Sequence, residues 1–177
     1  MDSDATPVPA VGPAAGTGVA IMRLSSLVAA LAWLAVSGAS THADMADGLA
    51  AFDAGDYATA FEEWRALAEA GDAEAQTALA GLYFAGLGAP ADAAAAVHWY
   101  RRAAEQGEAV AQQNLGDLYA TGRGVARDLV SAYLWLSLAA EQGRRWSARR
   151  RDQIGTQLSP EQRAEAEARI EAWRRSP

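Results

Sequence analysis

One segment of this chain occurs twice in tandem, with a period of 36 residues. When the sequence is displaced by 36 positions, residues 73–107 match residues 109–143 at a series of apolar and glycine positions, and the block Ala103–Gly107 returns unchanged as Ala139–Gly143. A fixed period of this length is typical of solenoids, in which each repeat is one supersecondary unit that stacks on the next. The repeat therefore predicts stacked units that offer an extended surface to a partner.

Each repeat has the pattern of two helices joined by a turn. The apolar residues recur at helical spacing in two groups, which are Ala75, Leu79, Leu82 and Tyr83, then Ala96, Trp99, Tyr100 and Ala103. Gly86 and Pro90 lie between the groups, where glycine can end a helix and proline cannot continue one. Asp92 and its counterpart Asp128 are placed to cap the second helices. We expect Trp99 and Trp135 to fill the centres of their units.

A shorter unit precedes the two full ones, because residues 55–71 match the second helix and its caps at the same spacing of 36. The joint between its helices is five residues shorter. The sequence therefore divides into a short unit over 44–72, full units over 73–108 and 109–144, and an arginine-rich pair of capping helices over 145–177. Ser159, Pro160 and Gln162 form the pattern of a capping box at the last helix.

The motif Leu-Tyr-x-x-Gly-x-Gly, followed by Asp, Ala, Trp-Tyr and Ala-Ala-Glu-Gln-Gly, resembles the Sel-one-like repeat (SLR), a relative of the tetratricopeptide repeat. The resemblance implies an all-α, right-handed superhelical solenoid of stacked antiparallel helix pairs that acts as an adaptor in protein complexes. It implies no shared catalytic residue and no cofactor. In some secreted bacterial relatives a disulfide bond cross-links each repeat, whereas this chain contains no cysteine.

Residues 22–43 have the parts of a secretory signal peptide: Met22-Arg23, an apolar run over 24–36, and small residues before a cut after Ala43. The alternative is a buried N-terminal helix. Residues 1–21 are acidic and proline-containing, and fit a mis-assigned start with translation beginning at Met22. We therefore expect a mature bacterial protein that is periplasmic or secreted, without a stable membrane anchor and without a nucleic-acid partner.

The search for chemistry is mostly negative. The mature chain has one histidine, His98, and neither cysteine nor a paired-ligand spacing for zinc. We expect no enzyme, no cofactor and no metal. The alternative hypothesis is a cell-envelope enzyme that acts on peptidoglycan or a β-lactam.

The first helices of stacked hairpins line the concave face, and six of their residues lie off the packing stripe. These candidate partner-binding residues are Thr77, Gly81, Phe84, Gln113, Asp117 and Ala120. Phe84 is either an exposed anchor for the partner or a residue packed against the short first unit.

Charge suggests a competing site at the other end of the chain. Residues 44–143 hold 15 acidic residues and five arginines, whereas residues 144–177 hold nine arginines and five acidic residues. Arg149, Arg150 and Arg151 are either a solvated cap face or a docking patch for an acidic partner. The leading hypothesis is an exported, monomeric adaptor that binds another protein or a cell-envelope component. A periplasmic regulator of a receptor's sensor domain is a narrower form of it.

Overall fold

The structure is a computed structural model that describes residues 44–175, so the predicted extension over 1–21 and signal peptide over 22–43 lie outside the described residues. Within 44–175 the secondary structure is entirely helical, which confirms the predicted all-α class. The helices are α2 Met45–Asp53, α3 Tyr57–Ala70, α4 Ala73–Ala85, α5 Ala93–Glu105, α6 Ala109–Thr121, α7 Leu129–Glu141, α8 Arg145–Gly155 and α9 Pro160–Arg174. None of the helices in this part of the chain combines the length and the apolarity that crossing a membrane requires.

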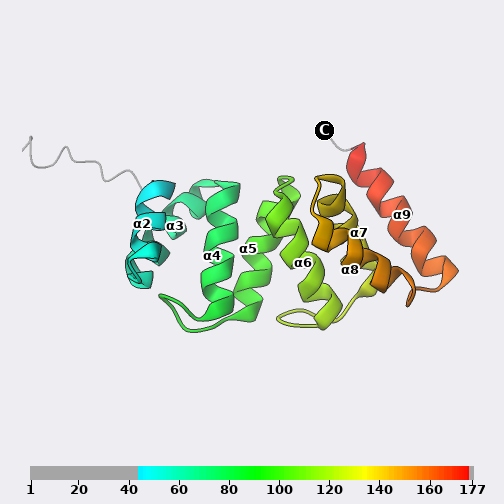
Figure 1. The fold of residues 1–177 in the computed structure, drawn as a ribbon, viewed down its shortest axis with the longest axis horizontal. Helices are drawn as coiled ribbons and strands as arrows, with labels where there is room; N and C mark the ends of the chain where they lie inside the picture. The colour runs from blue at the N-terminus through cyan, green and yellow to red at the C-terminus, as the bar shows by residue number, and fades with distance from the viewer. Residues whose placement is uncertain (1–43, 176–177) are drawn as a thin grey trace, which may run out of the picture. The chain divides into compact units, whose positions relative to one another are not determined.

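Each helix packs mainly on its neighbour in sequence, from α2 on α3 through to α7 on α8, and α9 packs back on α7. Figure 1 shows the helices following one another in chain order. This is the arrangement of a solenoid, in which a unit contacts only the units beside it. The predicted solenoid of stacked helix pairs is therefore confirmed for the described residues.

The helix ends follow the predicted chemistry. The Asp92 carboxylate accepts hydrogen bonds from the backbone N–H groups of Ala94 and Ala95, both at 2.9 Å, and Asp128 caps α7 in the same way. Gly86 ends α4 with φ of 71°, a left-handed conformation that glycine adopts without a Cβ clash. Ser159 and Gln162 complete a capping box at α9. Local sequence therefore sets these helix ends.

The core differs from the prediction at one of the two tryptophans. Trp135 is 8% exposed, but Trp99 is only half-buried and stacks against the Arg102 guanidinium, 5.1 Å from the ring centre. Tyr100 takes the central position of that unit instead, and burial raises the pKa of Tyr100 to about 12. The expectation that Trp99 fills its unit is corrected: Trp99 is partly buried and packs against two core clusters, whereas Tyr100 is a buried member of one of them.

Two fully buried glutamines join successive units. Nε2 of Gln76 donates to the Ala68 carbonyl at 3.1 Å, and Oε1 of Gln76 accepts from Nε2 of Gln106 at 2.8 Å. The same bonds recur 36 residues later around Gln112, which donates to Ala104 and accepts from Gln142. Each glutamine thus satisfies a carbonyl at the end of the previous second helix, where helices leave backbone acceptors unpaired.

The helical register continues beyond the second repeat. Helices α4, α6 and α8 begin at residues 73, 109 and 145, which are 36 residues apart. Ser147 and Ile154 on α8 are buried at the positions that Ala111 and Leu118 occupy on α6. Helix α8 is therefore the first helix of a fourth, degenerate unit. It extends the face that α4 and α6 begin.

Candidate partner-binding groove

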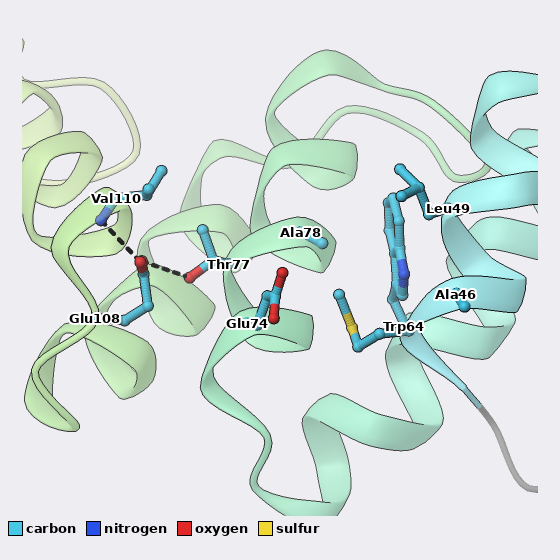
Figure 2. A pocket seen from close by; sticks show the side chains of 9 residues that line it. Ala46, Leu49, Trp64, Glu74, Thr77, Ala78, Glu108 and Val110 are labelled. Atoms are coloured by element: carbon cyan, nitrogen blue, oxygen red, sulfur yellow. Dashed lines mark hydrogen bonds between the residues drawn. The ribbon is translucent and has the colours of Figure 1, made fainter.

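A cavity of about 530 Å³ opens on the face that the first helices form, between α2, α4 and the start of α6. Figure 2 shows its lining residues. Apolar side chains dominate the lining, which consists of Met45, Ala46, Leu49, Trp64, Glu74, Thr77, Ala78, Glu108 and Val110. Leu49 is 53% exposed, and only one other large apolar residue among those described, Trp146, is also exposed. The apolar surface that lines this cavity is therefore left open by the described residues.

A second cavity of about 340 Å³ adjoins the first, because Trp64, Thr77, Ala78 and Val110 line both. It reaches along α4 past Gly81 and across to α6. Its other lining residues are Phe52, Leu82, Ala85, Leu87, Tyr100 and Asn114. We call the two adjoining cavities the groove.

Helix α2 forms one wall of the groove through a close approach to Trp64. A Cβ atom on Gly48 would lie 2.2 Å from Nε1 of Trp64, so only glycine lets the helix come this near. The Trp64 indole N–H is buried and finds no acceptor among the described residues. Because that N–H faces Gly48, the apolar part of the indole is what the groove receives.

The two carboxylates in the groove differ in what they bind. Glu108 caps α6: its carboxylate accepts from the backbone N–H of Val110 at 3.0 Å and from the Thr77 hydroxyl at 3.1 Å (Figure 2). A capping carboxylate is partly compensated by the positive end of the helix dipole. The Glu74 carboxylate is exposed and makes no hydrogen bond or ion pair with any described residue. Glu74 lies in the first turn of α4, so the helix dipole partly offsets its charge, but unlike Glu108 its carboxylate has no hydrogen-bond donor among the described residues.

Three of the predicted partner-binding residues lie on α4. Thr77 and Gly81 line the groove. Phe84 is half-buried, and the Arg123 guanidinium stacks over its ring at 4.2 Å from the centre. Phe84 packs against the core cluster of the two full units. The sequence predicted either an exposed anchor or a contact with the short first unit, and the observed position of Phe84 matches neither alternative.

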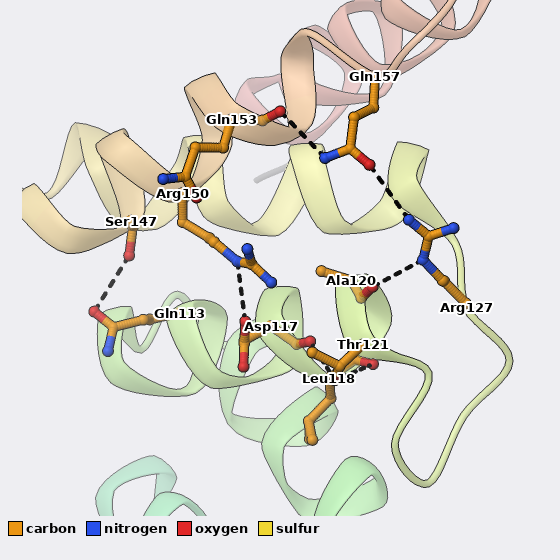
Figure 3. A network of polar contacts seen from close by, with 10 residues as sticks. All are labelled: Gln113, Asp117, Leu118, Ala120, Thr121, Arg127, Ser147, Arg150, Gln153 and Gln157. Carbon is orange, nitrogen blue, oxygen red and sulfur yellow. Dashed lines mark hydrogen bonds and ion pairs between the residues drawn. The ribbon is translucent and has the colours of Figure 1, made fainter.

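The three predicted residues on α6 are held by the helix that follows the second repeat. Oε1 of Gln113 accepts from Nε of Arg144 at 3.1 Å. It also accepts from the Ser147 hydroxyl at 3.2 Å, and Asp117 pairs with Arg150 at 3.2 Å (Figure 3). Asp117 still lines a small cavity beside Phe84. Ala120 is 7% exposed and packs in a core cluster with Ile154 of α8. Its prediction as a surface residue is corrected, because α8 covers it.

The three arginines of the predicted patch differ in what they contact. Arg150 pairs with Asp117, and Arg151 pairs with the adjacent Asp152 at 2.7 Å. Arg149 is exposed and forms no ion pair among the described residues. Because Arg150 reaches Asp117, the two competing predicted sites touch each other on the same face of the first helices (Figure 3).

His98 is exposed on α5. It is the residue that the alternative enzyme hypothesis would require. Its ring meets the Trp99 ring edge-on, with centres 5.2 Å apart. Within residues 44–175, no group of three or more histidine, cysteine, aspartate or glutamate side chains could hold a metal ion.

The comparisons with known proteins agree with this architecture. The Sel1 repeat model matches residues 73–108 and 109–143. A crystal structure of a protective antigen present in uropathogenic Escherichia coli strains, which displays an SLR fold, is 31% identical with a TM-score of 0.68. The alignment covers 71% of this chain and 28% of that one.

A Sel1 repeat protein from Oxalobacter formigenes is 33% identical with a TM-score of 0.58, over 61% of this chain and 44% of that one. The chain thus spans less than half the length of either relative. No curated protein sequence matches it. The repeat spacing, the helix pairs and these matches together identify residues 73–108 and 109–143 as two Sel1 repeats in a solenoid of the SLR fold.

Proposed function

We propose that this chain is an exported adaptor that binds a segment of a partner protein in the groove. Sel1 repeats are in general helical modules for protein interaction, which supports a binding function. The observation that carries the proposal is the groove itself, an apolar cavity of about 530 Å³ bordered by the exposed Leu49. Apolar side chains that fill such a cavity contribute most of the binding energy in a typical interface.

The proposal predicts that changing the groove weakens binding without unfolding the protein. Leu49→Ser removes exposed apolar surface, and Ala78→Leu places bulk in the space shared by both cavities. Each change should weaken the complex with a partner captured from periplasmic extract by about tenfold, which corresponds to ~1.4 kcal/mol. Isothermal titration calorimetry on the purified pair gives the affinity.

Trp146→Ser is the matched control, since Trp146 is the other large exposed apolar residue and does not line the groove. It should leave the affinity unchanged. A partner that binds both groove variants as tightly as the original protein would exclude the groove as the site.

Export is part of the proposal and rests on the sequence of residues 22–43. If this segment is a signal peptide, the mature chain begins at Asp44, the residue whose side chain caps α2 by accepting from the Ala46 N–H at 3.0 Å. Intact-mass spectrometry of the protein from the periplasm or medium should therefore give a mass that starts at Asp44. A full-length product that stays in the cytoplasm would contradict export and leave the binding proposal standing.

A further inference from the structure

We infer that the groove selects a peptide segment in which a lysine or arginine lies next to the apolar anchor residue. The inference rests on the proposed binding function and adds the charge of the partner. It follows from what surrounds the groove: a carboxylate at the apolar cavity without a partner among the described residues, no basic lining residue, and the five arginines of residues 44–143, each of which contacts another group of the chain.

The carboxylate is that of Glu74. It lies on the first turn of α4, and Figure 2 shows it between Thr77 on one side and Trp64 on the other. A peptide whose apolar side chain enters between Leu49 and Trp64 would bring its neighbouring side chains over Glu74. A cation there gains an ion pair, whereas a second carboxylate meets like charge.

No basic side chain lines either cavity of the groove. The arginines of residues 44–143 are all engaged by the chain itself: Arg65 by Glu62, Arg101 by the Tyr119 hydroxyl, Arg102 by Trp99, Arg123 by Phe84 and Arg127 by the Ala120 carbonyl. The excess of ten acidic residues over this range, 15 against five arginines, gives these units a net negative field, and no basic side chain lines the groove to offset it locally. Such a field raises the association rate of a cationic segment.

The arginine-rich end is a weaker candidate for the same partner. Arg150 and Arg151 are paired with Asp117 and Asp152, and Arg174 is paired with Glu141 and Glu171. An acidic segment that docked there would have to displace carboxylates that are already bound. Arg149 is exposed without an ion pair among the described residues, but it lines neither cavity of the groove, whereas Glu74 borders the apolar cavity that can take an anchor side chain.

The test uses a phage-displayed library of random dodecapeptides selected on the purified full-length chain. The selected peptides should share an apolar residue with lysine or arginine within two positions of it, more often than in the unselected library. Their affinity should fall when Leu49 is changed to serine. Binding of a synthetic copy of the most frequent peptide is then measured by fluorescence anisotropy.

Glu74→Gln should weaken that peptide by about three- to fivefold at low salt, as expected for a partly exposed ion pair, and by less at high salt, where the charges are screened. Glu105→Gln is the matched control, since Glu105 is an exposed carboxylate on α5 outside the groove. It should change the affinity much less than Glu74→Gln.

The outcomes separate this inference from the proposed function. Peptides that lose affinity with Leu49→Ser but carry no basic residue, or that ignore Glu74→Gln, overturn the charge inference and leave the groove as the binding site. Selected peptides that bind the Leu49→Ser and Ala78→Leu variants as tightly as the original protein overturn both.

Discussion

Replacing Trp135 with alanine should destabilise the whole repeat domain by about 3–5 kcal/mol, the usual cost of removing a large buried aromatic side chain. Trp135 is 8% exposed and belongs to the core cluster that also contains Leu115, Leu138 and Ile170. Its ring meets the Trp173 ring of α9 edge-on, with centres 5.3 Å apart and planes at 72°. The change therefore opens a cavity in the core. It also removes an aromatic contact that holds α9 against α7.

Urea denaturation followed by circular dichroism measures this loss. Trp99→Ala is the matched comparison, because Trp99 has the same place in the repeat but is half-buried. It should cost about 1–2 kcal/mol, within the range of ordinary substitutions. Equal losses of stability at the two positions would mean that the two tryptophans contribute alike because they share a repeat position, despite their different burial.

The contact with Trp173 can be measured separately. A double-mutant cycle with Trp135→Ala and Trp173→Ala should give a coupling of about 0.5–1.5 kcal/mol, as found for edge-to-face aromatic pairs. Additive losses would show that α9 is held by other contacts, such as those of Ile170 and Arg174.

Local signals in the sequence predicted most of the fold. The period of 36 gave the units, and aspartate and glycine at the helix ends gave their boundaries, because both act through bonds within a few residues. The capping box at Ser159 is one example, and the Asp92 cap is another. These interactions need no knowledge of what packs on the helix from elsewhere.

What the sequence did not predict at the candidate site comes from contacts between units. Whether Gln113, Asp117 and Ala120 are free depends on α8, which begins 36 residues after α6. The signal for α8 was weak, because Arg151 stands where the repeats have Leu79 and Leu115. Without that leucine the apolar pattern of a first helix is incomplete, although Ser147 and Ile154 keep the buried positions.

The roles of the buried glutamines and of Leu49 also depend on contacts that the sequence alone does not reveal. Gln76 and Gln112 repeat in the sequence, yet their side chains bind carbonyls eight residues earlier, on the preceding helix. A buried amide is explained only when its partners are known. Leu49 lies on the short α2, and its exposure follows from the open side of the first unit, which the sequence pattern alone does not describe.

Replacing Gly124 with alanine should cost on the order of 2–5 kcal/mol, although it adds one methyl group in a surface turn. The residue has φ of 71°, and its added Cβ would lie 2.2 Å from the carbonyl oxygen of Ala93, at the start of the preceding second helix. Alanine in the left-handed region costs about 1–2 kcal/mol, and overpacking adds about 1–3 kcal/mol.

The clash is a property of the repeat, because Gly88 makes the same approach to the Tyr57 carbonyl, also at 2.2 Å, 36 residues earlier. The turn of each unit therefore rests on the backbone of the unit before it. The sequence predicted a turn between the two helices of each unit, and the structure adds the inter-unit contact, which fixes the spacing of the units.

Gly107→Ala isolates this contact. Gly107 has φ of 89°, but nothing lies within 4 Å of its added Cβ, so only the left-handed cost of about 1–2 kcal/mol applies. Thermal and urea denaturation of the two variants should differ by the overpacking cost of about 1–3 kcal/mol. If Gly124→Ala proves no more destabilising than Gly107→Ala, the turn can move away from Ala93, and the stacking of the units does not depend on this contact.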